Sequence, residues 1–140
     1  MLDEYGFNKL QIIDSSAEGY NEIRDLEGDF IEFGLKDEDV IKKINNFQPH
    51  IVGISALFSS QFGCAERIGK EIKKKFPNTI LVYGGIHASK EYDNILKENR
   101  YIDYILTGEA DYTFTVFCDL FEKKENLKDC PSLAYFDEEE

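Results

Sequence analysis

The chain has 140 residues, of which 42% are hydrophobic and 14% aromatic, and its 16 basic and 28 acidic residues give a formal net charge of -12. This length and apolar content suit one domain with one packed core. The negative charge would repel phosphate backbones and anionic lipid headgroups, so it argues against nucleic acid and membrane surfaces as partners.

The cysteine content and the N-terminus indicate a cytoplasmic protein. Cys64, Cys118 and Cys130 are odd in number and match neither a disulfide framework nor a tetrahedral metal site, so we expect reduced thiols and no metal ligands. No apolar run approaches the roughly 20 residues that cross a bilayer. The start, Met1-Leu-Asp-Glu, lacks the basic residues of a signal peptide. We therefore expect a soluble, cytoplasmic protein.

The first third of the chain carries one clear helix. An apolar run at 10–13 is a strand candidate, and the polar stretch at 15–34 reads as a long connection with room for one short helix. From Asp37 onward the sequence favours a helix, because acidic residues occupy the first turn and Pro49 ends the pattern. The expected buried stripe of this helix is Val40, Ile41, Ile44 and Phe47.

Beyond residue 50, strand and helix patterns alternate at short spacing. The expected elements are a strand at 51–55, a helix from Ser59 or Ser60 to the residue before Pro77, a strand at 80–83, a helix at 91–98, a strand at 102–106, a helix capped by Asp111 and a short extra strand at 133–136. This alternation predicts parallel pairing with right-handed crossovers. The fold class is therefore α/β, an open, doubly wound parallel sheet with helices on both faces.

Three of these strands run straight into Gly, Ser or Glu. Because the carboxyl ends of parallel strands meet at one edge of a sheet, where this fold class binds its ligands, these residues mark a candidate site. The hydroxyls can bind a polar ligand, and the glycines can admit a flat one. The candidate ligand-binding residues are Ser55, Leu57, Ser59, Gly84, Gly85, His87, Gly108 and Glu109.

Each candidate also has a purely structural explanation. The serines can cap the following helix, the glycine pair can form a tight turn with positive φ, and His87 can be a solvated or capping residue. Glu109 at a helix start is favoured by the helix dipole whatever its function. No nucleophile with a base, paired carboxylates or metal cluster accompanies them. We therefore expect binding, with no catalytic residue in this chain.

Three segments together resemble the cobalamin-binding domain of B12-dependent radical SAM enzymes. They are Gln48–Leu57, Tyr83–Ser89 and Tyr101–Glu109, and the likeness runs from about Tyr5 to Phe136. The resemblance implies a flavodoxin-like, three-layer Rossmann-like fold with the corrinoid across the carboxyl edge of the sheet and its nucleotide tail in a slot. On this resemblance one wall of the slot is Ser55, Leu57 and Ser59, the other is Gly84 and Gly85, and the rim is Gly108 and Glu109.

The chain departs from that family at its start. The family's first strand, the loop after it and the first helix would precede Leu2, so we expect an N-terminally truncated domain. The missing strand would lie between the strands at 10–13 and 51–55 in the order 2-1-3-4-5, so we expect a homodimer, a strand rearrangement or low stability. The Asp-x-His-x-x-Gly motif, whose histidine ligates cobalt in related corrinoid methyltransferases, does not occur in this sequence.

The Cys-x3-Cys-x2-Cys run of a radical SAM core is also absent from the sequence. The parent enzyme would therefore bind its S-adenosylmethionine and 4Fe-4S cluster in a radical SAM core domain outside this chain. We expect residues 1–136 to be the cobalamin-binding module for methyl transfer or related radical chemistry, with 137–140 as an acidic tail or the start of a linker. The alternatives are a flavodoxin-like scaffold without corrinoid and a domain for a flavin or another nucleotide-like cofactor.

Overall fold

The computed structural model describes residues 9–25, 28, 31–56 and 59–137. By their internal contacts the described residues form two compact units, one within Lys9–Pro49 and one from His50 onward. We call the first the N-terminal unit and the second the sheet unit, and describe each by itself.

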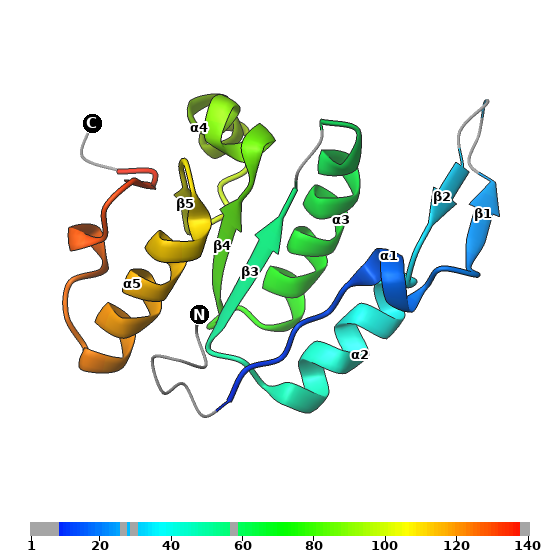
Figure 1. The fold of residues 1–140 in the computed structure, drawn as a ribbon, viewed down its shortest axis with the longest axis horizontal. Coiled ribbons are helices and arrows are strands. Elements are labelled where there is room, and N and C mark those ends of the chain that lie inside the picture. Colours follow the sequence, from blue (N-terminus) through cyan, green and yellow to red (C-terminus); the bar gives the residue numbers. More distant parts are fainter. Residues whose placement is uncertain (1–8, 26–27, 29–30, 57–58, 138–140) are drawn as a thin grey trace. The chain divides into compact units, whose positions relative to one another are not determined.

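The sheet unit contains a four-stranded sheet in the order β3-β4-β5-β6. Figure 1 shows β3, β4 and β5 running in the same direction, and the short β6 pairs antiparallel with β5. The elements are β3 (Ile51–Ser55), α3 (Ser59–Lys75), β4 (Ile80–Gly84), α4 (Ile86–Glu98), β5 (Tyr104–Leu106), α5 (Ala110–Lys123), the 3-10 helix η2 (Leu127–Asp129) and β6 (Leu133–Ala134). This mostly parallel α/β architecture confirms the predicted fold class.

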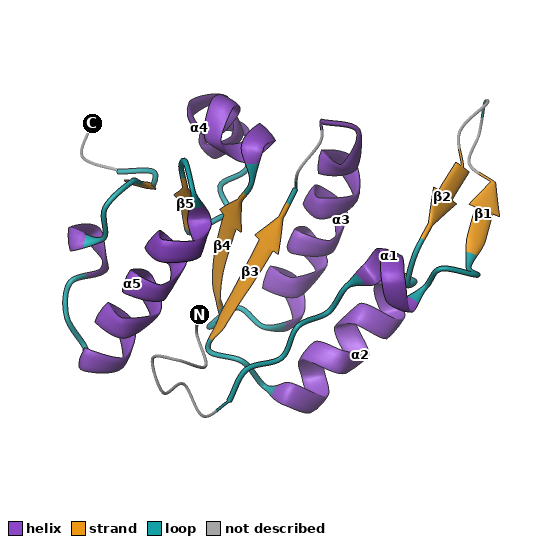
Figure 2. Ribbon diagram, viewed as in Figure 1, coloured by secondary structure: helices purple, strands orange, loops and turns teal. Residues whose placement is uncertain are grey.

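Helices cover both faces of this sheet (Figure 2). Val82 of β4 packs against Phe117 of α5, whereas the next residue, Tyr83, donates a hydrogen bond from its hydroxyl to the Ala65 carbonyl of α3 at 2.6 Å. Because successive strand residues point to opposite faces, α5 and α3 lie on opposite sides of the sheet. A groove between α3 and α4 places α4 beside α3.

Every element predicted for this unit is present, but the ends of α3, β4 and β6 differ by one or two residues, and three elements start elsewhere than predicted. The helix after β4 begins at Ile86 instead of residue 91, because Gly85 with φ of 99° turns the chain directly from strand to helix. Helix α5 begins at Ala110 with Glu109 as its N-cap, two residues before the predicted cap at Asp111. The strand predicted at 102–106 is shorter, since only Tyr104–Leu106 joins the ladder.

The amino edge of the sheet is closed by a partly buried polar network. Oδ2 of Asp103 accepts hydrogen bonds from Nζ of Lys73 at 2.8 Å and from the Leu81 N–H at 2.7 Å. Lys73 Nζ also donates to the Thr79 carbonyl at 3.0 Å. One carboxylate thereby ties the end of α3 to β4 and to the approach to β5.

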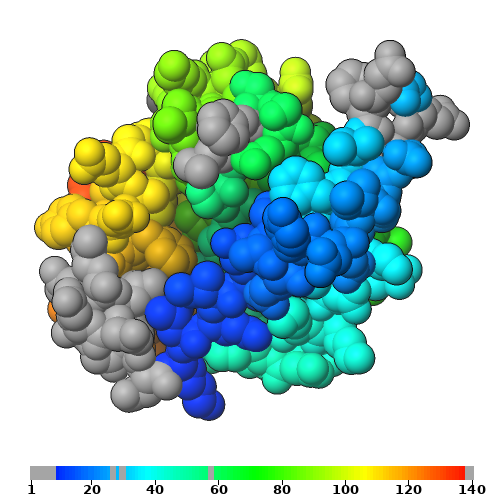
Figure 3. All heavy atoms as spheres, turned by 45° about the vertical axis from the view of Figure 1, so that its right-hand side comes forward, coloured from blue at the N-terminus to red at the C-terminus, as the bar shows by residue number. Residues whose placement is uncertain are grey.

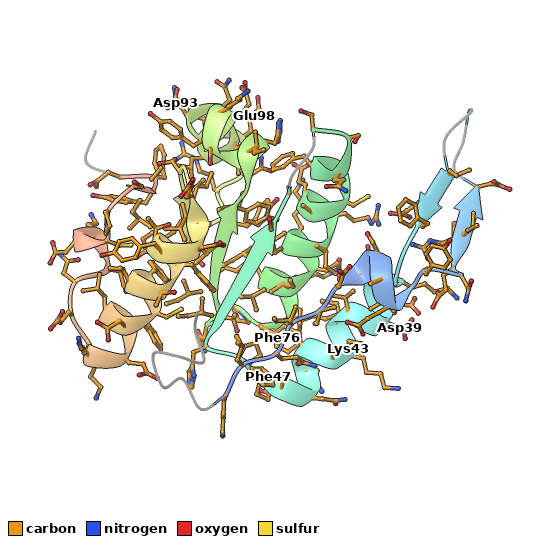
Figure 4. The ribbon with its side chains drawn as sticks, viewed as in Figure 1. Asp39, Lys43, Phe47, Phe76, Asp93 and Glu98 are labelled. Carbon is orange, nitrogen blue, oxygen red and sulfur yellow. The ribbon has the colours of Figure 1, made fainter. Side chains whose placement is uncertain are left out.

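The N-terminal unit holds α1 (Ser15–Glu18), β1 (Ile23–Asp25), β2 (Ile31–Phe33) and α2 (Asp37–Phe47). Helix α2 is confirmed, with Ile41 and Ile44 buried. Asp39 and Lys43 lie one turn apart on α2 (Figure 4), and Lys43 Nζ is 2.7 Å from a carboxylate oxygen of Glu18.

Two expectations for this unit are wrong. Residues 10–13 form no strand, because no described strand pairs with them and Ile12 is 79% exposed, so neither ladder hydrogen bonds nor burial favour one. The stretch at 15–34 is more than a connection with one helix, since it also contains the antiparallel pair β1 and β2. Runs of three residues are too short to show strand alternation clearly in a sequence.

The pair β1 and β2 turns its apolar face outward. Arg24 and Glu32 lie opposite each other, with Nε of Arg24 3.4 Å from Oε2 of Glu32, on one face. Ile23 and Ile31 are each 65% exposed and Phe33 is 54% exposed on the other.

The sheet order β3-β4-β5 agrees with the expected order of the last three family strands. On its other side β3 pairs with no described strand. Within the described ranges, no helix is long and apolar enough to cross a membrane.

Gly69 of α3 tests how tightly this helix packs on β4. A Cβ at Gly69 would lie 2.0 Å from the Tyr83 hydroxyl, which is fully buried and held by Ala65. We expect Gly69→Ala to lower the free energy of unfolding by about 1–2 kcal/mol, since overpacking outweighs the better helix propensity of alanine. Chemical denaturation measures the difference.

Gly63, on the same helix, provides the matched control, because nothing lies within 4 Å of a Cβ added there. Gly63→Ala should stabilise the chain by up to about 1 kcal/mol. Adding Tyr83→Phe to Gly69→Ala should recover part of the loss. Equal stability of the two alanine variants would contradict the packing described.

The buried tyrosines predict a loss of stability at alkaline pH. Burial, and then the neighbouring Tyr101, raises the pKa of Tyr83 far above its usual value of 10, and burial raises the pKa of Tyr101 to about 12. Above pH 10 the unfolded state therefore binds fewer protons than the folded state. We expect the free energy of unfolding, measured with urea, to fall as pH rises from about 10 to about 12. In Tyr101→Phe the fall should be smaller, and a flat profile would refute this account.

Candidate functional site

Small residues lie side by side where β3 and β4 end. Ser55, the last residue of β3, pairs in register with Gly84, the last residue of β4, and Gly53 lies two residues before Ser55. A Cβ on Gly53 would point at the Phe114 ring of α5 at 3.2 Å. A Cβ on Gly84 would meet only the Cβ of Ala110, also on α5, at 3.6 Å. Gly53, Ser55 and Gly84 thus form one surface on the α5 side of the sheet, which we call the small-residue surface.

Different physical reasons apply to the glycines at the adjacent positions 84 and 85. Gly85 has φ of 99°, and a Cβ there would lie 2.5 Å from the Ala56 carbonyl oxygen, so the turn needs glycine for its own backbone. Gly84 has no such need, because a Cβ there would make only one ordinary van der Waals contact, with the Ala110 Cβ at 3.6 Å, among the described residues. Packing within the described chain accounts for Gly85 and leaves Gly84 unexplained.

Ser59 and His87 meet on the α3 and α4 side of the sheet. Ser59 is the first residue of α3 and His87 the second of α4, and Oγ of Ser59 lies 3.0 Å from Nδ1 of His87. The His87 ring also packs on Phe62, with ring centroids 4.8 Å apart. The sequence predicted both residues at the carboxyl edge of the sheet but did not predict this contact.

Gly108 and Glu109 form the rim after β5. Gly108 has φ of 79°, and its N–H donates to Oγ of Ser89 in the first turn of α4 at 3.0 Å. Glu109 is exposed, and its side chain makes no capping hydrogen bond. The Ser89 hydroxyl therefore ties the glycine-pair segment to the rim.

A groove of about 640 Å³ runs between α3 and α4, whose side chains adjoin on the surface in Figure 3. Ser59, Phe62 and His87 line one end, and Glu98 on α4 (Figure 4) lines the other. Ser55 and Gly84 do not line this groove. The predicted residues are therefore divided between the small-residue surface, the contact of Ser59 with His87, and the rim.

One predicted residue, Leu57, lies outside the described residues. Three further residues were missed: Gly53, Phe62 and Ser89. Gly53 carried a usable signal, because a glycine inside a strand often marks close approach of another group. Phe62 and Ser89 gave none, since their roles depend on partners 25 and 19 residues away, His87 and Gly108.

The described residues hold no group of three or more His, Cys, Asp or Glu side chains that could bind a metal ion. The carboxyl edge instead offers the small-residue surface, with the Ser55 hydroxyl as its polar group, and the exposed Glu109 at the rim. A surface of small residues can accept a flat, polar-edged group.

Comparison with known proteins identifies the family of the chain. The B12 binding domain family matches residues 6–117. The chain is 31% identical over 121 residues to the cytidylyl-2-hydroxyethylphosphonate methyltransferase of Streptomyces wedmorensis, covering 85% of this chain and 22% of that protein. It is 33% identical over 101 residues to an uncharacterized methyltransferase of Pyrococcus horikoshii, covering 72% of this chain and 22% of that one.

A third relative is the anaerobic magnesium-protoporphyrin IX monomethyl ester cyclase of Rubrivivax gelatinosus, 34% identical over 95 residues, or 68% of this chain and 17% of the cyclase. The chain thus spans about a fifth of the length of these relatives, which are larger proteins. The family match covers most of the chain and includes all three strand ends that form the candidate site. The chain belongs to the B12-binding domain family.

Proposed function

We propose that this chain is the cobalamin-binding module of a larger radical SAM enzyme that performs methyl transfer or a related reaction. The family match and the methyltransferase and cyclase relatives support a corrinoid as the ligand. The catalytic partner would be a radical SAM core domain of the same protein, with S-adenosylmethionine and a 4Fe-4S cluster. The sequence resemblance of 48–57, 83–89 and 101–109 supports that partner.

The small-residue surface is the observation that carries the proposal. Gly84 is buried, and a Cβ there would meet only the Ala110 Cβ, at 3.6 Å, among the described residues, whereas the Phe114 ring already packs over Gly53. A flat aromatic group could therefore approach the backbone at Gly84, beside the Phe114 ring, where a larger side chain would exclude it. The nucleotide tail of a corrinoid carries such a group, so these residues fit it.

In this proposal the chain binds and orients the cofactor. The Ser55 hydroxyl can hydrogen-bond a polar edge of the tail on the α5 side of the sheet. Ser59, at the start of α3, can bond a different part of the tail, and Glu109 can accept from donors at the rim. The N–H of Gly108 is already used by Ser89, so it holds the rim loop instead of the ligand. Bound cobalamin would supply a cobalt centre for methyl-group chemistry, and the protein would supply position and polarity.

Gly84→Leu tests the proposed site. We expect the purified chain, mixed with hydroxocobalamin and passed through gel filtration, to retain about one corrinoid per chain, seen in the visible spectrum. Leucine at position 84 should weaken binding more than about tenfold, because it fills the space proposed for the tail. Gly85→Phe is unsuitable, since the φ of 99° and the Ala56 carbonyl would strain any side chain there whether or not a ligand binds.

Asn78→Leu is the matched control, because it adds the same side chain to an exposed turn before β4, at the opposite edge of the sheet. It should bind cobalamin as the unmodified chain does. A colourless unmodified chain would refute cobalamin binding by this chain, and uptake of flavin with yellow colour would favour the other cofactor class. Normal binding by Gly84→Leu would place the corrinoid away from the small-residue surface.

A further inference from the structure

The contact between Ser59 and His87 is supported from the core of the sheet unit. The His87 ring packs on Phe62, and Phe62 meets the ring of Tyr83 edge-on at a centroid distance of 6.2 Å. Tyr83 is fully buried, and its hydroxyl is fixed to the Ala65 carbonyl at 2.6 Å. This chain of contacts fixes the plane of the imidazole and leaves Nδ1 facing Ser59.

Ser59 itself is exposed at the first turn of α3. A serine hydroxyl has one hydrogen to donate and two lone pairs that accept. If Oγ accepts from Nδ1–H, the hydroxyl hydrogen stays available for another group, and if Oγ donates to Nδ1, that hydrogen is used. The protonated nitrogen of His87 therefore decides whether Ser59 can donate to a ligand.

We propose that His87 is a positioning residue of the cofactor site, which donates from Nδ1–H to Oγ of Ser59 and thereby directs the Ser59 hydroxyl hydrogen toward an acceptor on the nucleotide tail. The inference rests on the proposed function, because the acceptor belongs to the corrinoid. The tail is rich in acceptors, with phosphate oxygens and a heterocyclic nitrogen. His87 then acts through Ser59 and touches no part of the cofactor itself.

Binding of hydroxocobalamin by a set of variants tests this role. His87→Phe keeps a ring to pack on Phe62 but has no donor, and it should weaken binding roughly fivefold to tenfold, the effect of one hydrogen bond. His87→Asn can place an amide donor near the position of Nδ1, so it should recover most of the affinity. In a Ser59→Ala background His87→Phe should change nothing further, because the two residues act as one unit.

The protonation of the two ring nitrogens of His87 can be measured without cofactor. The sequence has two histidines, His50 and His87, so nitrogen-15 NMR of the imidazoles, with His50→Gln to assign the signals, reports which nitrogen of His87 carries the proton. We expect Nδ1–H, and we expect Ser59→Ala to shift this signal.

The outcomes separate the two proposals. If the unmodified chain binds no cobalamin, the proposed function fails and this inference falls with it. If the unmodified chain binds but His87→Phe binds equally well, or weakens binding as much without Ser59 as with it, only the positioning role is overturned. An NMR signal from Nε2–H with a bare Nδ1 would overturn it as well, whatever the affinities.

Discussion

The close approach of the Gly85 backbone to the Ala56 carbonyl is the contact on which the carboxyl edge depends. It lets the chain pass from β4 into α4 without a loop, so that α4 begins at Ile86. That early start puts His87 and Ser89 in the first turn, where His87 reaches Ser59 and Ser89 holds Gly108. A looser turn at Gly85 would separate both of these contacts, even with every other residue unchanged.

The two edges of the sheet are built for different tasks. At the amino edge Asp103 is satisfied by Lys73 and the Leu81 N–H, so the polar groups there hold the fold together. At the carboxyl edge the hydroxyl of Ser55 and the carboxylate of Glu109 have no hydrogen-bond partner among the described residues. Polar groups that bond to no described residue are available to a ligand, as the proposed cofactor site requires.

The sequence was sufficient for the elements that combine clear periodicity with clear ends, such as α2 between its acidic first turn and Pro49. It failed where tertiary pairing decides the outcome: residues 10–13 are apolar but pair with no described strand, and β1 and β2 are too short for their alternation to stand out. The parallel strand topology alone was enough to predict that the candidate residues lie at the carboxyl edge of the sheet. Their division between two faces, and the contact of Ser59 with a residue 28 positions away, required three-dimensional coordinates.

The different origins of the two adjacent glycines affect how diverging members of the family can be recognised. A member that had lost its corrinoid but kept its fold would still need glycine at the position of Gly85, since the backbone there collides with any side chain. On the proposed function, the position of Gly84 would be released, and alanine there would make only an ordinary contact with the Ala110 Cβ at 3.6 Å among the described residues. On the same proposal, the first glycine of the pair, together with Ser55, would distinguish a cofactor-binding member from a degenerate one, whereas the second would report only that the turn survives.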